Sequence, residues 1–226
     1  MSPTTKKISI IVMFVVIGFI AMQIPFSKLL GATNLRFSLF DFYGPIIGAF
    51  VGSLPGVLLV FVMQLVNWAI NGFQLDTATI IRFFPILAAA LYFAKHTRWT
   101  LMIPLFSILA FLAHPEGRNA WPFALYWIIP FVAYPFSQKY IFARALGATF
   151  TQHALGGALW IWGLNMKATL WMSLIPIVWK ERLLMALGIT LTYIAFNYLL
   201  SLAARAVKLE KSFLTLNPKY SVSETT

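Results

Sequence analysis

Residues 40–56 read FDFYGPIIGAFVGSLPG, an apolar run in which glycine recurs at every fourth position from 44 to 56. Residues four apart share one face of a helix, and glycine on such a face lets another helix backbone approach closely. Pro45 suits the first turn of a helix, and Pro55 suits the start of a second one. The stretch therefore predicts two helices joined by a tight turn and packed, as membrane helices are, through Gly44, Gly48, Gly52 and Gly56.

Composition extends this interpretation to the whole chain. Of its 226 residues, 60% are hydrophobic and only 10% are charged, against about 25% charged residues in a soluble domain. A single soluble core cannot bury so much apolar side chain, and a disordered chain does not carry it. The net charge of +11 comes from few, scattered basic residues, which indicates loops of a membrane protein and not a nucleic-acid-binding surface. Because the chain has no cysteine, disulfides and thiolate chemistry are excluded.

Eight apolar stretches are candidates for membrane segments. A helix needs roughly 20 residues to cross a hydrocarbon core of about 30 Å. The stretches 39–52 and 100–113 are short for a full crossing, so we expect them to be tilted, re-entrant or buried by neighbours. The sequence thus predicts an all-α fold, a polytopic transmembrane helical bundle of six to eight segments, with one transmembrane domain over residues 1–204. The stretches are 8–24, 39–52, 54–71, 79–94, 100–113, 120–137, 144–164 and 183–204.

Loop charges predict the orientation of the bundle. With the N-terminus inside and eight alternating segments, ten basic residues fall inside and seven outside, whereas Asp41, Asp76, Glu116 and Glu181 fall outside. The excess of basic residues follows the positive-inside rule. Residues 205–226 are basic and contain no apolar run, so we expect a cytoplasmic tail. The chain is accordingly expected to be a multi-pass protein of the cell (inner) membrane with both termini in the cytoplasm.

Two ionisable side chains fall inside apolar stretches near the predicted outer surface. Asp41 lies near the start of the second stretch, and Arg82 lies near the start of the fourth. Ionisable groups at membrane depth are costly, and so they are usually paired or functional. One interpretation is a structural ion pair of Asp41 with Arg36 or Arg82. The other is that one of them faces a ligand, because an arginine binds a carboxylate or phosphate at two points.

Polar residues also recur with helical spacing in the third and seventh stretches. Asn67, Asn71 and Gln74 share one face if their helix continues, either as a polar helix end at the membrane interface or as the rim of a pocket. His153 and Trp160 are seven apart and therefore on one face. That face either forms hydrogen bonds between helices or lines a cavity in which Trp160 stacks on a flat ring.

No catalytic or metal-binding pattern is visible. The turn containing His114 and Glu116 lacks a second histidine at ligand spacing, and zinc sites need three or four ligands. Neither a phosphate-binding loop nor the signature of a serine hydrolase or zinc protease occurs. We therefore expect no enzyme activity, no metal, no cofactor and no nucleic-acid partner. An intramembrane enzyme using His114, Glu116 or His153 is disfavoured because no set of nucleophile, base and orienting group is present.

Two strings resemble the S-components of energy-coupling factor (ECF) transporters, small membrane subunits that bind a vitamin or similar micronutrient. Residues 35–52 read LRFSLFDFYGPIIGAFVG and are followed by PGV at 55–57. In that family, a long external loop leads into a glycine-rich helix of this type and then a glycine-containing turn. Residues 153–162, HALGGALWIW, are similar to the fifth core helix of some S-components.

The resemblance covers about residues 8–95 and 144–204. S-components typically have six helices, so residues 100–137 are expected to form an inserted hairpin next to an S-component-like core. The resemblance implies a membrane-embedded substrate-binding subunit for micronutrient uptake, surrounded by membrane lipid and powered by a separate coupling subunit and separate ATPases. The alternative is a stand-alone secondary transporter or channel, in which Asp41, Arg82 and His153 serve an ion or proton pathway.

For the binding subunit, we expect the ligand to enter from outside, into a pocket capped by the 25–41 loop. Both the resemblance and the polar residues above point to one set of contacts with a small-molecule substrate. These expected contacts are Asn34, Arg36, Asn67, Asn71, Arg82, His153, Trp160 and Asn165.

Overall fold

The structure, a computed structural model, describes residues 3–28, 36–206 and 213–221. This part of the chain is mostly helical, with one small two-stranded hairpin in which β1 (Pro25–Lys28) pairs antiparallel with β2 (Arg36–Ser38). The α-helices are α1 (Pro3–Met22), α2 (Phe40–Val51), α3 (Ser53–Ile70), α4 (Thr77–Ala94), α5 (Met102–Ala113), α6 (Pro115–Asn119), α7 (Trp121–Ala124), α8 (Ile129–Ala133), α9 (Ile141–Leu164) and α10 (Ala168–Ala206). The 3-10 helices are η1 (Arg98–Leu101), η2 (Leu125–Ile128), η3 (Tyr134–Phe136) and η4 (Pro218–Tyr220).

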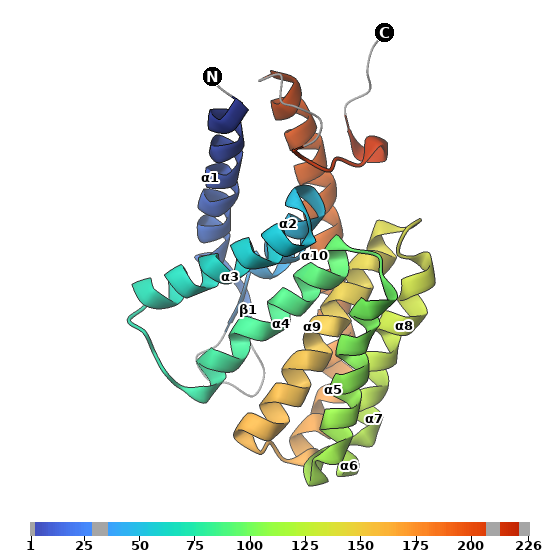
Figure 1. The fold of residues 1–226 in the computed structure, drawn as a ribbon. Helices are drawn as coiled ribbons and strands as arrows, with labels where there is room; N and C mark the ends of the chain where they lie inside the picture. The colour runs from blue at the N-terminus through green and yellow to red at the C-terminus, as the bar shows by residue number, and fades with distance from the viewer. Residues whose placement is uncertain (1–2, 29–35, 207–212, 222–226) are drawn as a thin grey trace.

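Helices α1, α5, α9 and α10 run along the length of the molecule, whereas α3 and α4 cross it obliquely (Figure 1). Both chain termini lie at one end, and α6 and the turn between α9 and α10 lie at the other. Among the described residues, α1, α3, α4 and α10 each contain an apolar window long enough to cross a membrane. The prediction of a mainly helical chain with several such helices is confirmed.

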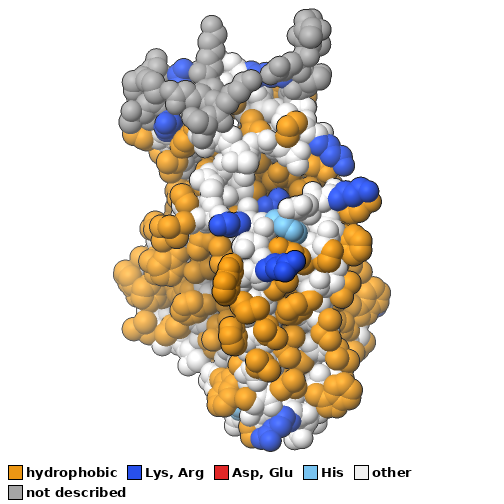
Figure 2. All heavy atoms as spheres, turned by 45° about the vertical axis from the view of Figure 1, so that its right-hand side comes forward, with side chains coloured by type: hydrophobic (Ala, Val, Ile, Leu, Met, Phe, Trp, Pro, Cys, Tyr) orange, Lys and Arg blue, Asp and Glu red, His pale blue; other side chains and the backbone are white. Residues whose placement is uncertain are grey.

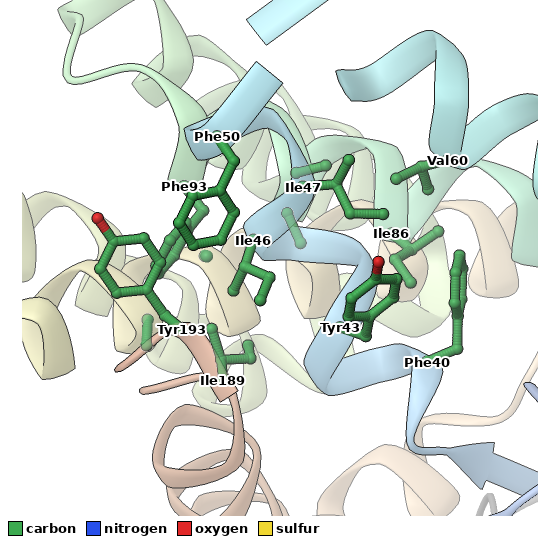
Figure 3. Close-up of a cluster of buried hydrophobic side chains, with 14 of the residues drawn as sticks. Phe40, Tyr43, Ile46, Ile47, Phe50, Val60, Ile86, Phe93, Ile189 and Tyr193 are labelled. Atoms are coloured by element: carbon green, nitrogen blue, oxygen red, sulfur yellow. The ribbon is translucent and has the colours of Figure 1, made fainter. Parts of the chain in front are cut away.

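The short helix α2 forms the centre of the larger apolar core. Eight of its twelve residues are buried, and Figure 3 shows its side chains between those of α3, α4 and α10. Ile46, Ile47 and Phe50 have no exposed surface, and Phe50 stacks on Tyr193 of α10 with 5.1 Å between ring centroids. A helix that is apolar all round is stable where other helices cover it. This cover explains how a stretch too short for an ordinary crossing is accommodated.

Glycine allows α2 to approach both neighbouring helices closely. A Cβ atom added to Gly56 on α3 would overlap the backbone of Gly48 on α2. On Gly44, a Cβ would come within 2.8 Å of the Ile86 side chain on α4. Gly52 joins α2 to α3 with φ of 98°, a conformation that favours glycine. The glycine row is thus two helices and a turn.

Proline placement agrees with the sequence analysis at one position and differs at another. Pro55 lies in the first turn of α3. Pro45, which was expected in the first turn of its helix, lies further inside because α2 begins at Phe40. The earlier start has a local cause: the backbone N–H groups of Phe42 and Tyr43 both donate to the Leu39 carbonyl.

The last helix is longer than predicted. α10 begins at Ala168 and not at residue 183, so Lys180, Glu181 and Arg182 lie within a helix and not in an external loop. The expectation placed the start of this helix at residue 183, with Glu181 and Arg182 at its outer end, because the uninterrupted apolar run begins only after these charges. Arg182 instead turns into the protein, where its side chain is only 2% exposed and pairs with Glu181.

The predicted segment 120–137 is not one helix. It consists of the short pieces α7, η2, α8 and η3. Pro122, Pro130 and Pro135 recur along it, and each lacks the N–H that a continuous α-helix requires. This broken segment packs against α9, which places its aromatic side chains behind the cavity described below.

The surface is apolar over a broad area. Figure 2 shows hydrophobic side chains covering the middle of one face, with most of the basic side chains above them. Large apolar side chains on different helices are exposed, including Leu58 on α3, Phe106 on α5 and Leu191 on α10. Surfaces of this extent are rare on soluble monomers and suit contact with lipid.

Part of the predicted tail packs back on the bundle. Leu214 is buried, and the Thr215 N–H donates to the carbonyl of Phe50 at the end of α2 over 2.9 Å. Asn197 on α10 has no exposed surface and pairs with the backbone of Asn217, accepting its N–H at 2.8 Å and donating to its carbonyl at 3.0 Å. Residues 213–221 therefore cover the end of the bundle where the termini lie.

Candidate functional site

A cavity of about 620 Å³ lies between the hairpin and helices α3, α4, α9 and α10. This size is typical of sites that hold a small molecule. Residues of the α3–α4 and α9–α10 connections border it, so it lies towards the end of the molecule opposite the chain termini. Its wall mixes aromatic side chains with polar and charged ones, notably Asp41, Gln64, Asn67, Trp68, Arg82, Phe83, Gln152, His153, Trp160, Trp171, Glu181 and Arg182.

Asp41 lies in the first turn of α2 and joins three parts of the chain. One carboxylate oxygen accepts the backbone N–H of Ser38 at 2.9 Å, and the other accepts the side-chain amide of Gln152 on α9 at 3.3 Å. The positive charges of Arg82 and Arg182 also act on it electrostatically. The carboxylate is therefore held in place by hydrogen bonds and by two cations from different helices.

Arg182 is the most deeply buried cation at the cavity. Its guanidinium group forms an ion pair with Glu181 over 3.1 Å and donates to the Thr149 hydroxyl over 3.4 Å. It also lies over the ring of Phe37 in the hairpin. Its Nε atom has no hydrogen-bond partner. Burying a charge is favourable only where partners compensate for lost water, so this arrangement restricts Arg182 to one orientation.

His153 lines the cavity from α9 and is supported from behind by the broken segment. The indole N–H of Trp127 donates to His153 Nδ1 over 3.0 Å. The rings of Phe123 and Phe150 lie close to the imidazole, with centroids 5.4 and 6.3 Å away. Trp127 can approach because position 157 is glycine: a Cβ there would overlap the indole ring.

The polar end of α3 forms one rim of the cavity. α3 ends at Ile70, and the chain then turns with positive φ at Gly72 and Phe73, so the single helical face expected for Asn67, Asn71 and Gln74 does not extend to Gln74. All three nevertheless border the cavity. The Asn71 amide donates to the Asn67 carbonyl at 2.6 Å.

The other predicted contacts divide into three groups. Arg82 and Trp160 line the cavity together with Asn67, Asn71 and His153. Asn165 ends α9 in a left-handed conformation (φ 49°), is exposed, and does not belong to the described wall of the cavity. Asn34 and the side chain of Arg36 lie outside the described parts of the chain.

Sequence reasoning missed Arg182, Glu181 and Phe37 as cavity residues. A signal for Arg182 was present: Val178, Arg182, Ile189 and Tyr193 recur with helical spacing, and all are buried. No local signal placed Phe37 over Arg182, because that contact depends on how the hairpin packs against α10.

The turn at His114 and Glu116 lies away from the cavity and links α6 to α10. Glu116 accepts the Ala168 backbone N–H at 2.8 Å and the Lys167 ammonium group at 3.2 Å. Both donors hold the pKa of Glu116 below its usual range, and the Ala168 N–H has the larger effect. Within the described residues, no group of three or more histidine, aspartate or glutamate side chains is placed to hold a metal ion.

Comparison with known proteins adds no assignment. No family model, no curated protein and no solved structure matches the chain.

Proposed function

We propose that this protein is a membrane-embedded substrate-binding subunit for the uptake of a vitamin or similar micronutrient. The observation that carries the proposal is the cavity of about 620 Å³, which is lined by the hairpin, the start of α2 and helices α3, α4, α9 and α10. Its volume falls in the range of about 300–1,000 Å³ that small-molecule sites occupy. The resemblance of residues 35–57 and 153–162 to S-components supports the same function.

The wall of the cavity supports a compact solute that has both a flat apolar part and polar groups. The half-buried Trp68 and the more deeply buried Trp160 and Trp171 line the cavity, and aromatic rings stack well on planar ligands. Asp41, Glu181, Arg82 and Arg182 are two acids and two bases, so their formal charges balance. Because these four side chains carry no net charge together, they do not neutralise a ligand that has a large net charge.

Orientation in the membrane follows from the charges at the two ends of the bundle. Lys6 and Lys7 lie in the first turns of α1, and Lys95, Arg98 and Lys139 lie in or next to the connections that join α4 to α5 and the broken segment to α9, towards the end that carries the termini. By the positive-inside rule this end faces the cytoplasm. The cavity then faces the outside of the cell membrane, where a scarce nutrient is captured. Energy comes from a separate coupling subunit and ATPases, since the sequence contains no phosphate-binding loop.

The second candidate function is a stand-alone secondary transporter. The observation that favours it is the group of charged side chains at one site, Asp41, Arg82, Glu181 and Arg182, because charges at membrane depth often mark an ion or proton pathway. In this case the chain moves its solute without an ATPase.

One pair of measurements distinguishes these functions. The chain is purified in detergent without partners, and any small molecule released on denaturation is identified by mass spectrometry. Its radiolabelled form is then offered to liposomes that contain only this chain. The binding-subunit proposal predicts a retained compound and no accumulation. Accumulation that follows an imposed proton or sodium gradient supports the transporter instead.

Arg82→Ala tests the assignment of the cavity itself. Loss of the retained compound is expected, because Arg82 lines the cavity. Arg98→Ala, at an exposed arginine of η1 near the opposite end, is the matched control and leaves retention unchanged. Full retention in a folded Arg82→Ala protein would remove Arg82 from the site.

A further inference from the structure

Trp127 does not belong to the described wall of the cavity, yet it contacts a residue that does. It is fully buried in η2, within the broken segment that the sequence analysis treated as an insertion. Its indole nitrogen lies 3.0 Å from His153 Nδ1. An indole N–H is a donor only and cannot accept a proton or a hydrogen bond. In this contact Trp127 must donate, and His153 Nδ1 must accept.

This contact fixes the protonation of the imidazole. A neutral histidine carries its proton on one ring nitrogen and has a lone pair on the other. Since Nδ1 uses its lone pair to accept from Trp127, the proton is on Nε2. No group of the described residues forms a hydrogen bond with Nε2. His153 is part of the cavity wall, so Nε2–H is the polar group that the ring offers to a ligand.

We propose that Trp127 is a positioning residue that makes His153 a hydrogen-bond donor, and that the ligand presents an acceptor to Nε2. This inference rests on the proposed function of the cavity as a binding site. The matching ligand group is a carbonyl oxygen, a carboxylate oxygen or an unprotonated ring nitrogen. An ammonium group, which can only donate, is rejected, because a buried donor facing another donor loses its hydrogen bond.

The same arrangement excludes two other roles for His153. A metal ion on Nε2 needs a lone pair there, so the proton must move to Nδ1. The Nδ1–H and the Trp127 N–H would then be two donors facing each other. Taking up a second proton has the same effect, because both ring nitrogens are then donors. His153 is therefore a poor metal ligand and a poor proton carrier, which weakens a proton pathway through this residue.

Packing holds the Trp127 indole in its position next to His153. Phe111 and Phe123 contact the Trp127 indole edge to face, at centroid distances of 4.8 and 5.9 Å. On α9, a Cβ at Gly157 would overlap the indole ring, so glycine is needed for this approach. The tryptophan is thus enclosed by α5, α7 and α9 and cannot turn away from His153.

The first test reads the histidine directly and needs no ligand. In protein labelled with nitrogen-15 histidine, the ring nitrogen shifts report which atom carries the proton, and His153→Gln assigns the signal among the three histidines of the chain. We expect one fixed form with the proton on Nε2. Trp127→Phe keeps an aromatic ring but removes the donor, and we expect signals averaged over both forms. A wild-type spectrum with the proton on Nδ1 would overturn the inference, whether or not Trp127→Phe folds.

The second test uses retention of the compound that co-purifies with the protein. A glutamine amide reaches roughly the position of Nε2, whereas an asparagine amide reaches that of Nδ1. We expect His153→Gln to retain the compound at least tenfold better than His153→Asn. Equal retention, or the reverse order, contradicts the inference. If wild-type protein retains no compound, the proposed function fails, while the spectrum still decides the role of Trp127.

Discussion

The guanidinium group of Arg182 on α10 lies over the ring of Phe37 on β2, with 5.1 Å between the guanidinium carbon and the ring centroid. This contact connects the hairpin to the longest helix across the cavity that both border. The ring of Phe37 also stacks on the ring of Phe26 in β1. Phe26 in turn stacks on Phe42 of α2, with 4.5 Å between the ring centroids. The hairpin is therefore held over the cavity by aromatic and cationic groups.

Replacing Phe37 with leucine should loosen the hairpin while keeping an apolar side chain. A desolvated cation–π contact is worth about 2 kcal/mol, and its loss should speed hydrogen exchange of the backbone amides at residues 37 and 38. Phe106→Leu, at an exposed position of α5, is the matched control. Unchanged exchange in Phe37→Leu would show that the contact does not hold the hairpin.

The close approach of α2 and α3 should be sensitive to a single methyl group. Gly56→Ala places its Cβ against the backbone of Gly48, which cannot move aside, so the two helices must separate. Overpacking of this kind costs about 1–3 kcal/mol, and the midpoint of thermal unfolding in detergent should fall. Gly156→Ala is the control, because its Cβ would meet only Pro85 at 3.5 Å. Equal midpoints for the two variants would contradict the packing.

The connection between α6 and α10 should weaken in acid. The Ala168 N–H and the Lys167 ammonium group lower the pKa of Glu116 in the folded protein, relative to its ordinary value of 4.5. The stabilisation is therefore fully present above pH 4.5 and is lost as the pH falls through the lower folded-state pKa. The protection factors of the amides at residues 114–120, which are exchange rates corrected for the intrinsic effect of pH, should fall over that range. Glu116→Gln should show low protection at every pH. A fall in protection as large as that of the wild type would show that another group causes it.

Asn197 should hold the tail segment 213–221 against the bundle. Asn197→Ala removes the acceptor of the Asn217 N–H and one of three donors to the Asn217 carbonyl, which keeps the Tyr220 N–H and the Ser221 hydroxyl. An N–H left without a partner away from water costs about 1–3 kcal/mol. Chymotrypsin should then cleave at Phe213 or Tyr220 much faster than in the wild type. Asn165→Ala, at an exposed asparagine, should leave the cleavage rate unchanged. Protection that survives in Asn197→Ala would assign the attachment to other contacts.

How much the sequence could predict depends on the range of each interaction. The glycine spacing in residues 44–56 is a local pattern, and it correctly indicated two helices and a turn. Trp160 was placed beside His153 because seven residues separate them on one helix. Arg182 was placed at the outer start of the last helix because the apolar run begins at residue 183, although its buried position follows a helical period. The contact between Phe37 and Arg182, and the support of His153 by Trp127, join distant segments and leave no pattern in a single sequence.

Native mass spectrometry of the purified chain and of two variants at Gly156 shows whether the cavity holds a small molecule. This glycine borders the cavity and has room for a methyl group, so a leucine side chain at the same position would extend into the cavity space. We expect a bound small molecule on the wild type and on Gly156→Ala, and none on folded Gly156→Leu. The same bound mass on all three proteins, or on none of them, would show that the cavity is not the binding site.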